Sequence, residues 1–123
     1  MTAFLLVGLG GALGAMARYG VGRLVGATAL PWATLIVNVS GGFAMGLLAG
    51  WLAFRGSGGE SWRLLLGVGV LGGFTTFSAF SLDMMLLIER GQAGTAIAYA
   101  LASVVLALGA LAAGLWIMRS LTA

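Results

Sequence analysis

Several residue types that proteins use for chemistry are missing from this sequence. It contains no cysteine, no histidine and no lysine. Without thiols there are no disulfides, and without thiols or imidazoles the usual zinc, copper and haem sites cannot be assembled. No phosphate-binding loop ending in lysine is present, no nucleophile stands beside a base, and no carboxylates are paired for acid–base work. We therefore expect that the protein is not an enzyme and holds no transition metal.

Charge is also scarce. Charged residues make up 7% of the 123 residues, whereas hydrophobic residues make up 61%, and the mean hydropathy is +1.12. This composition lies far from that of soluble domains and indicates an integral membrane protein surrounded by lipid. The six arginines give a net charge of +3, but they are scattered singly. Because no basic cluster could follow a phosphate backbone, we expect no nucleic-acid partner.

Four apolar segments are long enough to cross a bilayer, which requires about 20 residues in a helix. They cover residues 3–21, 31–54, 63–88 and 93–118. We expect an all-α membrane protein with a single four-helix transmembrane domain over residues 1–123. The first segment lacks a basic leader, so we expect a retained helix rather than a signal peptide.

The arginines are divided almost equally between the two sides of such a membrane domain. One side would carry Arg55, Arg63 and Arg119, and the other Arg23 and Arg90 with Arg18 close by. Since arginine bias normally sets orientation, two alternatives stay open. The chain inserts both ways and assembles as an antiparallel dual-topology dimer, or a single arginine or an insertion partner fixes one orientation.

Small and polar residues recur at helical spacing. Gly42, Gly46 and Gly50 follow Asn38 at four-residue steps, and Gly10 and Gly14 do the same in the first segment, which is typical of helix–helix packing faces. Thr95, Tyr99 and Ser103 form a hydroxyl stripe in the fourth segment. Asn38 and this stripe fit either an ion path or hydrogen bonds between helices. Arg18 fits either an anchor that snorkels to water or a positive charge at the mouth of an anion path.

The stretch GGFTTFSAF, residues 72–80, is a poor helix inside an apolar segment. A break at Gly72–Gly73 would free carbonyl groups, which suit a small hard cation such as Na⁺. Phe77 and Phe80 favour the opposite charge, because the edge of an aromatic ring is positive. A phenylalanine pair at this spacing also fits plain core packing.

Three stretches resemble the signature segments of the Fluc (CrcB-type) fluoride channels of bacteria: GGALGAMARY (10–19), NVSGGFAMG (38–46) and GVLGGFTTFSAFSLD (69–83). The resemblance implies four transmembrane helices, the third broken near its centre, in an antiparallel dual-topology homodimer. It implies two pores that carry fluoride passively out of the cytoplasm, across the bacterial inner membrane, and so reduce its toxicity.

The same resemblance implies roles for individual residues. The carbonyls of Gly72 and Thr75 from both subunits are expected to hold a structural, non-transported Na⁺. Phe77, Phe80 and Asn38 are expected to line the pores, with Arg18 near the aqueous vestibule. Tyr99 and Ser103 fall on the polar track of the fourth helix, where Ala107 replaces a hydroxyl that family members often carry.

Two other classes compete with this interpretation. A small dual-topology multidrug transporter has the same size, but it depends on a glutamate in its first helix, and residues 3–21 contain no acidic residue. A structural subunit of a larger membrane complex accounts for the glycines. It gives no reason for the break, the hydroxyl stripe and the paired phenylalanines together.

Overall fold

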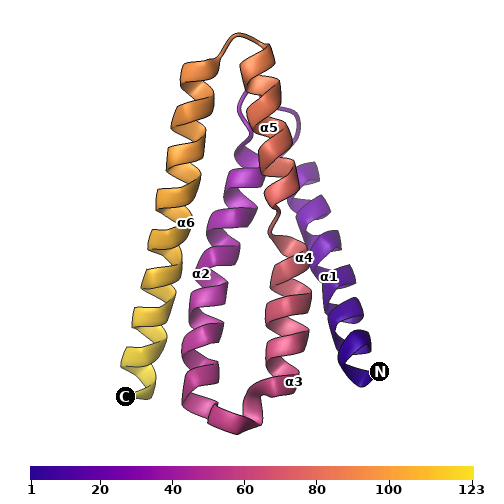
Figure 1. The fold of residues 1–123 in the computed structure, drawn as a ribbon, viewed down its shortest axis with the longest axis vertical. Helices are drawn as coiled ribbons and strands as arrows, with labels where there is room; N and C mark the ends of the chain where they lie inside the picture. The colour runs from indigo at the N-terminus through magenta and orange to yellow at the C-terminus, as the bar shows by residue number, and fades with distance from the viewer.

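The computed structural model describes all 123 residues, and every regular element is helical. Three long helices are α1 (Thr2–Val25), α2 (Trp32–Arg55) and α6 (Ala93–Thr122). Between α2 and α6 the chain passes through five shorter elements: η1 (Gly56–Gly59), α3 (Glu60–Trp62), η2 (Arg63–Leu71), α4 (Gly72–Phe74) and α5 (Phe77–Glu89). The part from η2 to α5 runs antiparallel to α2 (Figure 1), and we call it the return arm.

Three stretches are long and apolar enough to cross a membrane: Thr2–Val25, Trp32–Glu89 and Ala93–Thr122. The second has 58 residues and folds back on itself at η1 and α3 (Figure 1). Only 15 of the 123 residues are buried, so most apolar side chains face outward. The fold is therefore that of a multi-pass membrane protein, which needs lipid or another protein around it.

Glycines determine where three of the helices end. Gly26, Gly56 and Gly91 have φ angles of 75°, 66° and 76°, a conformation that side chains with a Cβ rarely adopt. The first helix is longer than the expected segment 3–21, since α1 continues to Val25 before Gly26 ends it. The starts of α2 after Pro31 and of α6 at Ala93 agree with the sequence.

Glycines also allow the helices to approach closely. A Cβ added to Gly14 would collide with the carbonyl oxygen of Val70, and one added to Gly10 would lie 2.9 Å from the Cα of Gly69. A Cβ at Gly46 would likewise collide with the backbone of α6. The predicted packing faces are thus confirmed: α1 packs on the return arm, and α2 packs on α6.

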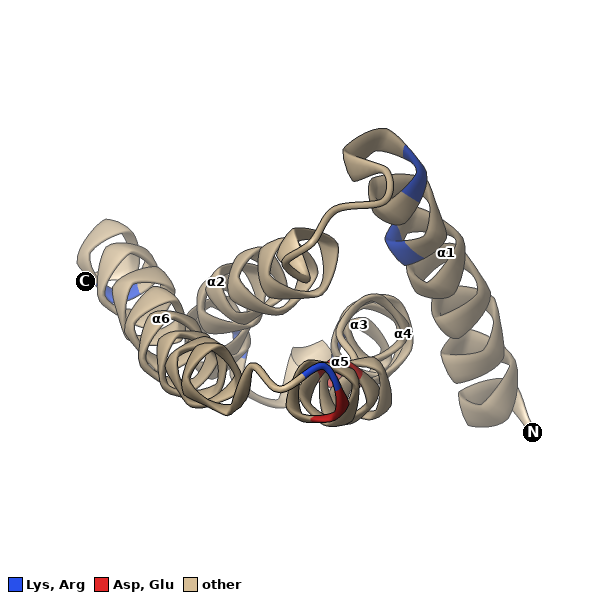
Figure 2. Ribbon diagram, turned by 90° about the horizontal axis from the view of Figure 1, so that it is seen from above, with Lys and Arg blue, Asp and Glu red and all other residues tan.

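The return arm is not a uniform α-helix. η2 is a π-helix, in which N–H groups bond to carbonyls five residues back, and the N–H of Gly72 still bonds to the carbonyl of Gly67. Such segments are rare and often lie near functional sites. Seen from above, the return arm and α2 lie between α1 on one side and α6 on the other (Figure 2). Residues of this arm can therefore meet side chains from every long helix.

Candidate functional site

The return arm breaks at Thr75 and Thr76, which have extended backbone angles (φ −85°, ψ 157° and φ −151°, ψ 125°). The expected break at Gly72–Gly73 is wrong by three residues, because both glycines are helical in α4. Gly73 serves close packing instead, since a Cβ there would lie 2.5 Å from the carbonyl oxygen of Gly11 in α1. The β-branched threonines suit extended backbone better than helix.

Side chains from two other helices hold the broken segment. Asn38 of α2 contacts both backbone groups of Thr76: its Nδ2 donates to the carbonyl oxygen at 3.0 Å, and its Oδ1 accepts from the N–H at 2.8 Å. The Nε of Arg18 in α1 donates to the carbonyl oxygen of Gly73 at 3.3 Å. These bonds replace intrahelical partners that the break removes.

The threonine hydroxyls complete the ends of the two helices. Thr76 Oγ1 accepts from the N–H of Ala79 at 3.0 Å and so caps the start of α5. Thr75 Oγ1 donates to the carbonyl oxygen of Leu71 at 2.9 Å, beside the backbone bond from its own N–H at 3.0 Å. The break is therefore an ordered turn in which the N–H groups of Thr75, Thr76 and Ala79 are all bonded.

Most of the predicted pore residues meet at one cavity of about 290 Å³, which we call the phenylalanine cavity. Its lining contains Asn38, Thr75, Thr76, Phe77, Phe80, Ser103, Val104 and Ala107. The ring centroids of Phe77 and Phe80 are 5.6 Å apart. Phe77 is 78% exposed, so a single chain leaves this cavity open on one side.

The two hydroxyls predicted from the fourth segment differ in their contacts. Tyr99 is buried, its hydroxyl donates to Asp83 Oδ2 at 3.0 Å, and its ring lies 5.2 Å from that of Phe80. Ser103 is also buried, but its hydroxyl has no hydrogen-bond partner. A buried unpartnered hydroxyl is unusual, and here it belongs to a residue that lines the phenylalanine cavity.

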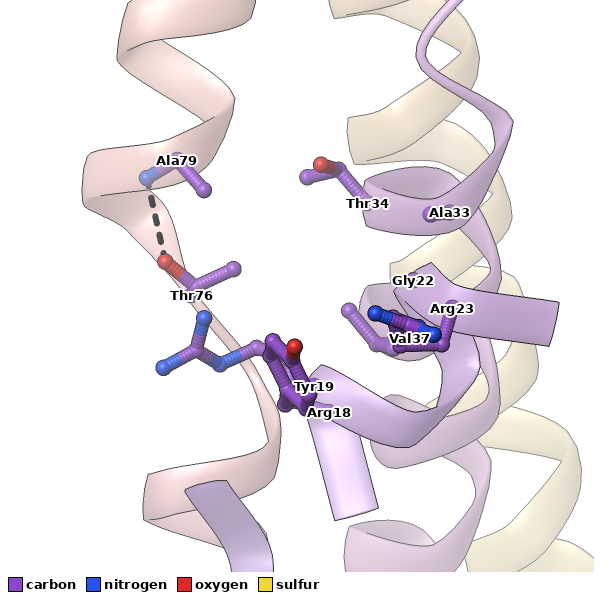
Figure 3. Close-up of a pocket in the computed structure, with 9 residues that line it drawn as sticks. All are labelled: Arg18, Tyr19, Gly22, Arg23, Ala33, Thr34, Val37, Thr76 and Ala79. Carbon is purple, nitrogen blue, oxygen red and sulfur yellow. Dashed lines mark hydrogen bonds between the residues drawn. The ribbon is translucent and has the colours of Figure 1, made fainter. Parts of the chain in front are cut away.

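A second cavity of about 380 Å³ lies next to the first, and Thr76 lines both. We call it the arginine cavity (Figure 3). Its lining contains Arg18, Tyr19, Gly22, Arg23, Ala33, Thr34, Val37, Thr76 and Ala79. The guanidinium group of Arg18 lies beside the backbone at Thr76 (Figure 3). Two cationic side chains and no acidic one therefore line a cavity that adjoins the predicted pore residues.

Comparison with known proteins identifies the family. A family model described as CrcB-like protein, Camphor Resistance (CrcB), matches residues 5–115. The chain belongs to the CrcB-like family. A fluoride-specific ion channel FluC of Phenylobacterium zucineum is 58% identical over 127 aligned residues, which cover 97% of each chain. A fluoride-specific ion channel FluC 2 of Nitrobacter hamburgensis is 54% identical, with 97% of this chain and 98% of the relative covered.

A further relative, the fluoride-specific ion channel FluC of Caulobacter vibrioides, is 54% identical over the full length of both chains. The resemblance drawn from the three signature segments is thereby confirmed. The CrcB-like family is one of ion channels, so this member is not an enzyme, in agreement with the lack of a catalytic set in its sequence.

The break in this CrcB-like chain frees the two carbonyls that were predicted to hold Na⁺. In a continuous helix the Gly72 carbonyl would accept from the N–H of Thr76, but that N–H bonds to Asn38. The Thr75 carbonyl would accept from the N–H of Ala79, but that N–H bonds to Thr76 Oγ1. Both carbonyls thus lack their α-helical donors, and carbonyl oxygens at a broken helix suit a hard cation.

Two residues of the site were not singled out in the sequence. Thr76 was part of the unusual stretch, and its position just before a resumed helix is a signal for an N-cap. Arg23 stands five residues after Arg18, a spacing that does not place two side chains on one helix face. Only the packing of α1 against α2 and the return arm brings both arginines to one cavity.

Proposed function

We propose that the protein is a fluoride-selective ion channel that exports fluoride passively from the cytoplasm across the bacterial inner membrane. The phenylalanine cavity carries this proposal, because it joins Asn38, Phe77, Phe80 and Ser103 beside a helix break. The family and the names of the relatives support it. The chain has no acidic residue in α1, so nothing favours a proton-coupled drug transporter.

Fluoride is small and strongly hydrated, so a pore must replace part of its water with donors and positive edges. The Ser103 hydroxyl has no partner inside the protein and is free to donate. The Asn38 amide uses one of its two N–H groups on Thr76, which leaves the other for the cavity. The ring edges of Phe77 and Phe80 supply the remaining positive potential. Tyr99 has a supporting role and does not donate to the ion, since its hydroxyl bonds to Asp83.

A second copy of the chain would complete the pore. Phe77 is 78% exposed and lines a cavity with no cover on that side, and the arginines give no orientation bias. These two features support an antiparallel dual-topology homodimer in which each chain crosses the membrane four times, as α1, α2, the return arm and α6. Such a pair would contain two phenylalanine cavities and hence two pores.

The freed carbonyls of Gly72 and Thr75 would hold a structural Na⁺ where the two return arms meet. Each chain offers two carbonyls, so an antiparallel pair would supply four. A bound ion would supply fixed positive charge beside these carbonyls. Asn38 and Thr76 maintain this site, because their hydrogen bonds take the N–H groups that would otherwise cover both carbonyls.

Efflux from liposomes tests the proposal. Purified protein in fluoride-loaded liposomes should release fluoride to an ion-selective electrode, whereas chloride-loaded liposomes should stay sealed. Equal leakage of both ions, or none of either, would reject a selective fluoride channel. Single-cysteine variants labelled from each side of the membrane would test dual topology, which a single labelled orientation would exclude.

Replacing Phe80 by isoleucine tests the role of the ring. We expect F80I to abolish fluoride efflux, since an aliphatic side chain of similar bulk lacks the positive ring edge. Cross-linking should still give the wild-type oligomer. Normal efflux by F80I would show that the ring does not contact the ion.

A further inference from the structure

The arginine cavity holds a cationic side chain that no expectation from the sequence assigned to the ion path. Arg23 lies two residues before the end of α1, is exposed, and lines this cavity together with Arg18. α1 carries no acidic residue: both of its basic positions, and no acidic one, are coloured on that helix in Figure 2.

The two arginines differ in what holds them. Arg18 is half-buried, and its Nε is bonded to the Gly73 carbonyl, so its guanidinium group is fixed beside the helix break. Arg23 makes no hydrogen bond to the protein and no ion pair; the ion pair in this structure joins Arg63 and Glu60 at the other end of the molecule. Its charge is therefore not compensated by a neighbouring carboxylate.

The position of the arginine cavity indicates what the charge of Arg23 can do. Thr76 forms a shared wall between the arginine cavity and the phenylalanine cavity. Within this lining Arg23 is exposed, whereas Arg18 is half-buried and bonded at the helix break. An anion coming from solvent along this side would therefore meet Arg23 before Arg18 and the donors around Thr76. At about 380 Å³ the arginine cavity is far larger than a single fluoride ion, so it can attract anions by charge but cannot select them by size.

We propose that Arg23 raises the rate of fluoride permeation by concentrating anions in the arginine cavity through its long-range field. It acts without contacting the permeating ion inside the pore. This inference deepens the proposed function and rests on it. A field effect has a signature that a structural role lacks, because salt screens it.

The size of the effect follows from Coulomb's law. For a unit charge on the order of 10 Å from the ion in water-like surroundings, the local fluoride concentration rises about 1.5- to 2-fold at an ionic strength of about 10 mM, where screening extends over about 30 Å. At about 1 M the screening length falls to about 3 Å, and the enhancement should disappear.

The experiment compares fluoride efflux from liposomes at these two ionic strengths, set by a bulky impermeant salt and matched osmotically. The fluoride concentration is kept well below saturation, so that the rate follows the local concentration. We expect Arg23→Gln to lose about 1.5- to 2-fold in initial rate at low ionic strength and nothing at high ionic strength. Arg23→Lys keeps the charge and should match the wild type at both.

Arg90→Gln is the matched control. It removes the same charge at the same end of the molecule, where α5 meets α6 (Figure 1), but Arg90 does not line the arginine cavity and follows Glu89 directly. We expect no change. Three outcomes would overturn the inference: a normal rate of Arg23→Gln at low salt, an equal loss at both salts, or an equal loss in Arg90→Gln. Failure of the wild-type protein to release fluoride would instead refute the proposed function.

Discussion

The most informative test of the helix break is to remove the two hydrogen bonds between Asn38 and Thr76. We choose Asn38→Leu, because leucine has a similar shape but can neither donate nor accept a hydrogen bond. The change leaves the N–H and the carbonyl oxygen of Thr76 without the partners they now have at 2.8 and 3.0 Å. We expect it to loosen the break and to reduce fluoride efflux.

The expected loss of folding stability in Asn38→Leu has an upper and a lower bound. A buried backbone group left without a partner costs about 1–3 kcal/mol, so two such groups set an upper bound of about 6 kcal/mol. Hydrogen bonds inside membranes are measured at about 0.6 kcal/mol on average, which sets a lower bound near 1 kcal/mol for the pair. Thr76 lines two cavities that water can enter, so we expect the lower half of this range, about 1–3 kcal/mol.

Two measurements check this prediction. Unfolding in detergent micelles gives the loss of stability, and hydrogen exchange reports the Thr76 amide directly, which should exchange faster in Asn38→Leu while amides of α6 stay protected. Ser40→Ala is the control on the same helix, because the Ser40 side chain is exposed and bonds only to the Ile36 carbonyl of its own helix. Unchanged stability and unchanged Thr76 exchange in Asn38→Leu would refute the role of Asn38 as a clamp.

Two further changes test the site and the packing. Ser103→Ala removes a buried hydroxyl that has no partner in the protein. Stability should therefore stay the same or rise by about 1 kcal/mol, while fluoride efflux falls. Normal efflux would exclude Ser103 from the ion path. Gly14→Ala should destabilise by about 1–3 kcal/mol in micelle unfolding, because its Cβ collides with the carbonyl oxygen of Val70. Gly8→Ala is its control, with no atom within 4 Å of the added Cβ; equal stability of the two variants would contradict the packing argument.

The sequence was sufficient for features that depend on local chemistry. Hydropathy and the position of Pro31 placed the long helices, and four-residue glycine spacing identified the faces of α1 and α2 that pack. Both signals can be read from the sequence of a single helix. Hydropathy indicates burial in lipid, and four-residue glycine spacing indicates a groove along one side of the helix. Neither needs knowledge of the partner helix.

The location of the break depended on tertiary structure and was missed. The low helix propensity of Gly72 and Gly73 pointed to them, but propensity is a weak prior when packing decides. Gly73 is helical because α1 passes within van der Waals contact of it. The extended backbone falls instead on Thr75 and Thr76, where an amide 38 residues away in the sequence can pair with it.

The contacts around Thr76 show how the break is maintained. Side-chain oxygens accept the N–H groups that would bond to backbone carbonyls in a continuous helix. Asn38 takes the N–H that would cover the Gly72 carbonyl, and the hydroxyl of Thr76 takes the N–H that would cover the Thr75 carbonyl. The same two side chains therefore interrupt the helix and free the two carbonyls proposed for Na⁺. Because Thr76 also lines both the arginine cavity and the phenylalanine cavity, any shift of its backbone would change the proposed cation site and both cavities of the proposed anion path at once. Loss of Asn38 should thus impair fluoride efflux even though its own amide supplies at most one N–H to the ion.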